Sequence, residues 1–144
     1  LGCDLVVASD RARFSEIFAR RGLSIDFGGS WFLPRRVGLH KAKELALLAE
    51  IIDAAEAERL GLVNRVVPVE DLDAAVDEWV QKLAAGPPIA LAQTKALLDR
   101  SSTSSLADAL AAEAAAQTVN FGTSDTLEAI GAFLEKRQPH YTGR

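Results

Sequence analysis

A single carboxylate, Asp26, stands in a stretch whose residue types suit proton transfer. Residues 22–34 read GLSIDFGGSWFLP, which places Asp26 beside Gly28 and Gly29 and among apolar side chains. Apolar surroundings disfavour the charged form of a carboxylate and raise its pKa toward the range useful for acid/base catalysis. Asp26 is therefore our candidate proton-transfer residue. The structural alternative is that Asp26 only accepts a hydrogen bond in a helix-entry turn, because Asp and Gly are common turn residues.

Short strands and helices are predicted around this stretch. A β-branched apolar run at residues 4–9 is typical of a buried strand, and a weaker alternation at 11–15 indicates a shorter one. A helix is predicted over 30–36 with Ser30 as its cap, and strong helix formers predict another over 41–50. The first strand is expected to have an unpaired edge, which another segment or subunit should cover.

The rest of the chain is predicted to be helical after one more strand. Asp53 begins a capping-box pattern for a short helix that ends at Gly61, and residues 62–67 form a strand. Longer helices are predicted over 70–85, 88–100, 106–121 and 124–137. The alanine-rich helix over 106–121 has few large apolar residues, so it must pack closely against a neighbour. This helix and the first strand both indicate a partner surface.

Composition limits the classes of function. The chain has 144 residues, of which 49% are hydrophobic and 25% charged, and these values are typical of one globular domain. A net charge of -4 and a pI near 5.2 give no overall positive field, so nucleic acid and anionic membranes are excluded as general partners. No apolar run is long enough to cross a bilayer.

Cysteine and histidine usage points to a chain without disulfides or a metal site. Cys3 is the only cysteine, and His40 and His140 are too far apart for metal-ligand spacing. We therefore expect a cytoplasmic setting. The sequence begins without Met and directly before an apolar strand, which is typical of a cut through a domain.

Four motifs, in this order and at this spacing, resemble the enoyl-CoA hydratase/isomerase (crotonase) superfamily. They are CDLVVAS followed by ARF within residues 3–14, GLSIDFGGSWFLPRRVG at 22–38, AAEAERLGLVNRVV at 54–67 and AFLEKRQPHY at 132–141. The resemblance implies an α/β fold, the C-terminal part of a superhelix of ββα units, mostly helical with two or three short strands. Residues 1–67 would complete the spiral core, and residues 68–144 would form a helical trimerisation region.

The resemblance also implies an enzyme that acts on acyl-CoA thioesters and assembles as a homotrimer or hexamer. Coenzyme A would enter only as part of the substrate, with no other cofactor. Backbone N–H groups that hold the thioester enolate, usually the largest catalytic contribution, would lie in a part of the protein before Leu1. The chain by itself is therefore expected to be inactive.

Individual residues receive roles from the same resemblance. Aligned without gaps over residues 3–38, a glutamate used by the family's hydratases falls on Phe18, which transfers no protons, and Glu16 stands two residues away. Asp26 falls where dienoyl-CoA isomerases and epoxyphenylacetyl-CoA isomerases carry an aspartate, and the latter group is the more similar. The resemblance therefore implies that Asp26 is a single acid/base.

Binding residues are implied in two places. Phe18, Phe27, Gly28, Gly29 and Trp31 would line the acyl pocket, and core packing is the alternative role of the three aromatic side chains. Lys136 would lie near the adenine end of CoA bound to a neighbouring subunit; its alternative role is to complement the dipole at a helix C-terminus.

The expected activity is the isomerisation of a double bond or ring in an unsaturated acyl-CoA. One alternative is an enoyl-CoA hydratase that adds water to a trans-2-enoyl-CoA through Glu16 or an upstream acid. The other is a non-catalytic module that only binds acyl-CoA or assembles, which the phenylalanine at position 18 favours.

Overall fold

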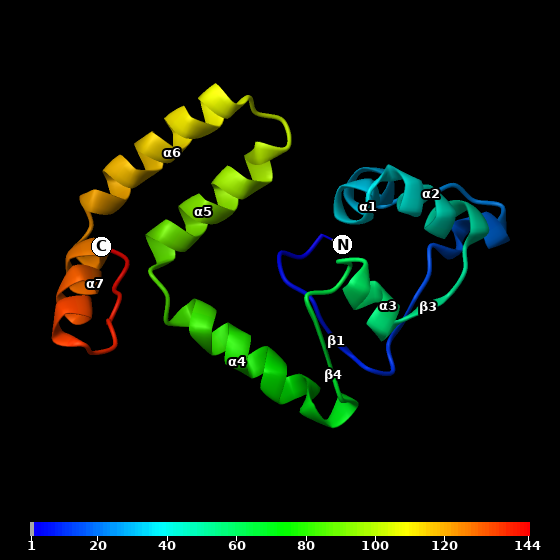
Figure 1. Ribbon diagram of the computed structural model, residues 1–144, viewed down its shortest axis with the longest axis horizontal. Coiled ribbons are helices and arrows are strands. Elements are labelled where there is room, and N and C mark those ends of the chain that lie inside the picture. The colour runs from blue at the N-terminus through cyan, green and yellow to red at the C-terminus, as the bar shows by residue number, and fades with distance from the viewer. Residues whose placement is uncertain (1) are drawn as a thin grey trace. The chain divides into compact units, whose positions relative to one another are not determined.

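The computed structural model describes residues 2–144 (Figure 1). By packing, the chain divides into two units, one that ends at Glu78 and one that begins at Trp79, and each is described by itself. The division lies inside helix α4 (Leu72–Ala84), and the predicted division into a spiral core at 1–67 and a trimerisation region at 68–144 stays a prediction. No helix of residues 2–144 has the length and apolar content needed to span a membrane.

Unit 1 consists of short elements joined by tight turns. Its strands form two pairs. β1 (Val7–Ser9) runs parallel to β4 (Arg65–Val67) with Ala8 opposite Val66, and β2 (Arg13–Phe14) runs antiparallel to β3 (Ile52–Asp53) with Phe14 opposite Ile52. The first strand therefore has a partner within the chain along one edge. The elements before α4 are β1 (Val7–Ser9), β2 (Arg13–Phe14), the 3-10 helix η1 (Ile17–Arg21), α1 (Gly29–Val37), α2 (Leu39–Leu48), β3 (Ile52–Asp53), α3 (Ala54–Arg59), β4 (Arg65–Val67) and the 3-10 helix η2 (Val69–Asp71).

Two apolar clusters form the core of unit 1. In one, Leu33 of α1 packs with Ala42 and Leu45 of α2. In the other, Ala8 of β1 packs with Ala57 and Val63. The predicted cap at Asp53 is confirmed, since its side chain accepts a hydrogen bond of 2.8 Å from the N–H of Glu56 at the start of α3.

Unit 2 is helical, as the sequence predicts after residue 67. It contains α5 (Pro88–Ser101), α6 (Leu106–Phe121) and α7 (Ser124–Glu135). Pro88 opens α5, the Ser105 hydroxyl caps α6, and the Thr123 hydroxyl caps α7. α5 packs along α6, and α6 contacts α7.

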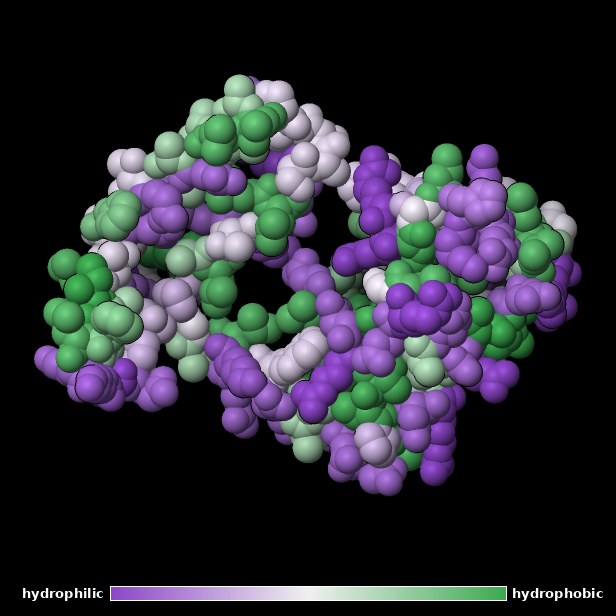
Figure 2. Space-filling view, in the orientation of Figure 1, coloured by the Kyte–Doolittle hydropathy of each residue, from purple (hydrophilic) through white to green (hydrophobic). Residues whose placement is uncertain are grey.

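The helices of unit 2 leave many large apolar side chains exposed. Figure 2 shows hydrophobic residues gathered on the surface over α7, where the exposed side chains are Leu127, Ile130, Phe133 and Leu134. Leu106, Leu110, Val119 and Phe121 are exposed on α6. Apolar faces of this extent are typical of surfaces that pack against another protein.

Candidate active site

Asp26 lies in the turn between η1 and α1, and the backbone of this turn is tightly defined. Its carbonyl oxygen accepts a hydrogen bond of 2.8 Å from the N–H of Gly29. The next two residues, Phe27 (φ 49°) and Gly28 (φ 76°), are both in the left-handed region. Gly28 is the N-cap of α1. The cap predicted at Ser30 is wrong, because the positive φ at Gly28 starts the helix earlier and Ser30 is already inside it.

The expected burial of Asp26 is also wrong within this chain. The Asp26 side chain is exposed, and so are two of the apolar residues expected to desolvate it: Phe27 is 96% exposed and Trp31 44% exposed. Only Leu33 of these apolar neighbours is fully buried, and it packs against α2. Residues adjacent in sequence point in different directions from a left-handed turn and a helix start, so their apolar surface does not enclose the carboxylate.

Gly28 and Gly29 have a clear structural role in this turn. Gly29 is buried, and a β-carbon at this position would lie 2.7 Å from Cγ1 of Ile25. A β-carbon on Gly28 would lie 3.1 Å from the ring of Phe32, and its φ of 76° also favours glycine. The two glycines therefore keep the Asp26 turn compact. Their predicted part in an acyl pocket stays a prediction.

The second carboxylate near this turn belongs to Glu16, which is half-buried. Glu16 lines an apolar cavity of about 150 Å³ together with Val6, Phe14, Ser15, Leu33, Leu45, Ile52 and Leu62. Burial raises the pKa of Glu16 above its usual value of 4.5, and the negative charge of Asp26 raises it further. The Oε2 atom of Glu16 would lie 3.8 Å from a β-carbon on Gly29, so this carboxylate sits beside the start of α1.

The aromatic residues predicted for the acyl pocket lie outside the lining of this cavity. Phe18 is half-buried in η1. Trp31 packs edge-on against Phe32 with 5.0 Å between ring centroids, and the Arg35 guanidinium lies 3.8 Å above its ring. The structure thus places Glu16, which the sequence indicates only as a neighbour of Phe18, in the apolar setting that was expected around Asp26. The sequence signal for this setting was the position of Glu16 between apolar residues in the run FSEIF at 14–18.

Lys136, the predicted CoA-binding residue, lies in unit 2 at the C-terminal end of α7. It has a left-handed backbone with φ 56° and ψ 38°, and its side chain is exposed. Among residues 2–144, no group of three or more His, Cys, Asp and Glu side chains is arranged to hold a metal ion.

Comparison with known proteins gives consistent matches over the whole chain. The family model described as Enoyl-CoA hydratase/isomerase matches residues 1–144. A probable enoyl-CoA hydratase of Rhodobacter capsulatus is 42% identical over 100% of this chain and 56% of its own length. The 1,2-epoxyphenylacetyl-CoA isomerase of Escherichia coli is 35% identical over 100% of this chain and 55% of its own length.

Solved structures show the same relationship. An enoyl-CoA hydratase/isomerase from Cupriavidus metallidurans is 43% identical with a TM-score of 0.91, and the match covers 98% of this chain and 53% of that one. A putative enoyl-CoA hydratase/isomerase from Mycobacterium abscessus is 36% identical with a TM-score of 0.95. This match covers 99% of this chain and 55% of that one. The predicted fold class is confirmed. The chain spans about half the length of these relatives, and its placement in their C-terminal half stays a prediction.

Proposed function

Since this chain belongs to the enoyl-CoA hydratase/isomerase family, we propose that its protein isomerises an unsaturated acyl-CoA, with Asp26 as the acid/base. The observation that carries the proposal is the Asp26 turn. Its carboxylate is accessible, its backbone is fixed by Phe27 and Gly28, and it stands at the N-terminal end of α1, where the helix dipole favours negative charge. A relative at 35% identity is itself an isomerase of an acyl-CoA.

In the proposed reaction, the Asp26 carboxylate removes a proton from one carbon of the acyl chain. The electron pair of the broken C–H bond moves into the conjugated system and places negative charge on the thioester oxygen as an enolate. Asp26 then returns the same proton to another carbon, so the double bond moves and no water is consumed. We assign the N–H groups that stabilise the enolate oxygen to residues outside this chain, as the resemblance implies.

Lys136 is the proposed contact for the CoA portion of the substrate. Its ammonium is exposed, and CoA carries phosphate groups to which a lysine is attracted. CoA would take part only as a portion of the substrate, with no further cofactor, and the protein would work in the cytoplasm.

A homotrimer or hexamer is the proposed assembly. The exposed apolar side chains over α6 and α7 support it, because a second copy of the chain would remove them from water. Sedimentation of the purified protein at micromolar concentration tests this proposal, and a purely monomeric protein would contradict it.

Hydration of a trans-2-enoyl-CoA is the second candidate function, and one specific observation favours it. Glu16 lines an apolar cavity, and burial raises its pKa, which is the direction that favours a carboxyl group as a proton donor. Several relatives, including the one from Rhodobacter capsulatus, are named as hydratases. A non-catalytic acyl-CoA-binding role is the third candidate, which Phe18 favours.

Two substitutions in the protein that carries this chain separate the three candidates. Asp26→Asn should lower isomerisation of unsaturated acyl-CoAs by about 100-fold or more, the usual contribution of a general acid/base, whereas Glu16→Gln should leave it within a few-fold of wild type. If Glu16→Gln abolished turnover and Asp26→Asn did not, the hydratase would replace the isomerase. If the wild-type protein bound acyl-CoA without turnover of any kind, the non-catalytic role would replace both.

A further inference from the structure

The last turn of α7 has a geometry that usually belongs to glycine. The N–H of Arg137 donates to the carbonyl of Ala132 at 3.0 Å, and the N–H of Lys136 donates to that of Phe133 at 3.3 Å. This pair of bonds defines a Schellman turn, whose left-handed residue is most often glycine because a β-carbon is strained there. Here that residue is Lys136, at φ 56°. A strained residue kept where glycine would fit better points to a role beyond folding.

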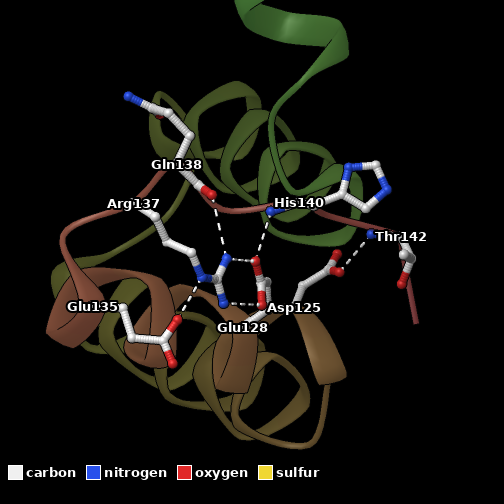
Figure 3. Close-up of polar contacts among 7 residues, drawn as sticks. All are labelled: Asp125, Glu128, Glu135, Arg137, Gln138, His140 and Thr142. Atoms are coloured by element: carbon white, nitrogen blue, oxygen red, sulfur yellow. Dashed lines mark hydrogen bonds and ion pairs between the residues drawn. The ribbon is translucent and has the colours of Figure 1, made fainter.

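Arg137, the next residue, is held by several carboxylate and carbonyl oxygens (Figure 3). Its Nη1 and Nη2 atoms donate to the two carboxylate oxygens of Glu128, with 2.9 Å for the Nη2 bond. Its Nε donates to Glu135 at 2.6 Å, and Nη1 also reaches the carbonyl of Gln138 at 3.3 Å. We call Glu128, Glu135 and Arg137 the tail clamp. A bidentate contact of this kind fixes the direction of a guanidinium as well as its position.

The tail clamp extends into the segment that follows it. Glu128 accepts a further hydrogen bond of 2.8 Å from the N–H of His140, and Figure 3 shows this bond beside the Arg137 pair. Farther along, the buried carboxylate of Asp125 accepts from the N–H groups of Thr142 at 2.7 Å and Gly143 at 2.9 Å. The chain on the far side of Lys136 is therefore fixed at two places along α7.

The tail clamp does not include Lys136, so the Lys136 ammonium can bind another anion. Glu128 and Glu135 are both engaged by Arg137, so neither needs the Lys136 ammonium as a partner. Within residues 2–144, no hydrogen bond or ion pair of the Lys136 side chain is found. A cation whose backbone is already ordered binds an anion at a smaller entropic cost than one on a free tail.

We propose that Glu128 and Arg137 are positioning residues: they hold Lys136 in its left-handed turn and so set the affinity for the CoA portion of the substrate without contacting it. This inference rests on the proposed function, specifically on the contact between Lys136 and CoA. It adds that residues several positions away control that contact through the backbone.

The decisive measurement is whether a substitution changes KM or kcat for an acyl-CoA substrate. The affinity for CoA, measured by calorimetry, is a second readout. Glu128→Gln should raise KM and the Kd for CoA several-fold and leave kcat unchanged. Arg137→Lys keeps the charge but loses the bidentate contact, so it should raise KM by a smaller factor. Glu113→Gln removes one carboxylate from α6 outside the tail clamp and should change neither constant.

Two substitutions at Lys136 separate a functional role from a structural one. Lys136→Ala should raise KM about tenfold or more, the loss expected for a hydrogen bond between charged groups. Lys136→Gly should raise KM to the same extent while the melting temperature stays equal or rises, because glycine is unstrained at this φ.

The results distinguish the two levels of the proposal. If Lys136→Ala left KM and the Kd for CoA unchanged, this result would contradict the proposed contact between Lys136 and CoA. If Lys136→Ala weakened CoA binding but Glu128→Gln and Arg137→Lys did not, these results would contradict the positioning role and support the contact. A loss of kcat in parallel with melting temperature in Glu128→Gln, with KM unchanged, would show that the tail clamp serves stability alone.

Discussion

Unit 1 and unit 2 are stabilised in different ways. Unit 1 encloses apolar clusters around Leu33 and Ala57. In unit 2, Ala132 is the one buried apolar side chain within residues 79–144, and the polar residues Thr123 and Asp125 are buried at the start of α7. The Asp26 turn is therefore stabilised by an apolar core in its own unit, whereas the end of α7 is stabilised by carboxylates. Apolar helix faces in unit 2 are thus left exposed.

Truncating a buried side chain in the core of unit 1 should lower the free energy of unfolding more than any other change considered below. Leu33 is 2% exposed, so Leu33→Ala should lower the free energy of unfolding by about 2–5 kcal/mol. Leu98 on α5 is 67% exposed, and the same truncation there should cost less than about 0.5 kcal/mol. Urea unfolding followed by circular dichroism measures both. Equal losses would contradict the difference between the units.

Removal of the buried carboxylate in unit 2 should have the next largest effect. Asp125 is 4% exposed and accepts hydrogen bonds from the backbone N–H groups of Thr142 and Gly143. Asp125→Ala should therefore cost about 1–3 kcal/mol, because these donors lose their acceptor. Hydrogen exchange at Thr142 and Gly143 should also become faster. Asp99→Ala on exposed α5 is the matched control, and an effect of similar size there would contradict the role of Asp125.

Acid should weaken the tail clamp at a pH set by Glu128. The hydrogen bonds from Arg137 and, next, from the N–H of His140 lower the pKa of Glu128 from 4.5 to about 2. A lowered carboxylate pKa stabilises the folded chain above pH 4.5, and this contribution is lost as the pH falls toward about 2. The difference in melting temperature between wild type and Glu128→Gln should therefore shrink across this range. Because the tail clamp is exposed to solvent, added salt should also reduce this difference in melting temperature. A pH-independent difference would contradict the account.

The smallest expected effect concerns the two carboxylates near α1. Burial is the main cause of the raised pKa of Glu16, and the charge of Asp26 adds to it. Asp26→Asn should thus lower the pKa of Glu16 slightly but leave it above 4.5. A carbon-13 NMR titration of the Glu16 carboxyl measures this shift. A pKa that returned fully to its usual value would show that Asp26, not the apolar cavity, controls Glu16.

Much of the helical framework could be predicted from the sequence because its signals are local. The helix over 106–121 has the predicted bounds, and the cap at Asp53 follows from residue type and spacing. The helix predicted over 30–36 agrees with α1 to within one residue at each end, but its cap was placed at Ser30 instead of Gly28, because the sequence does not show which of the clustered turn residues takes the positive φ. Similarly, the apolar residues around Asp26 are neighbours in sequence, but the turn directs them apart.

The tail clamp could not be predicted by the same reasoning. Glu128 and Arg137 meet only because the chain reverses at Lys136, a residue whose type does not favour the left-handed region. Asp125 and Thr142 are farther apart still. Charges at the end of a helix suggested only a favourable interaction with its dipole, but α7 ends at Glu135, before Lys136 and Arg137, and that reasoning gives Glu128 no partner.

Product analysis in water labelled with oxygen-18 tests whether Asp26 transfers the proton without the addition of water. Wild-type protein that carries this chain should convert an unsaturated acyl-CoA to an isomer of unchanged mass, and Asp26→Asn should slow this conversion by about 100-fold or more. A hydroxyacyl-CoA product that contains oxygen-18 and forms equally fast with Asp26→Asn would contradict this role of Asp26.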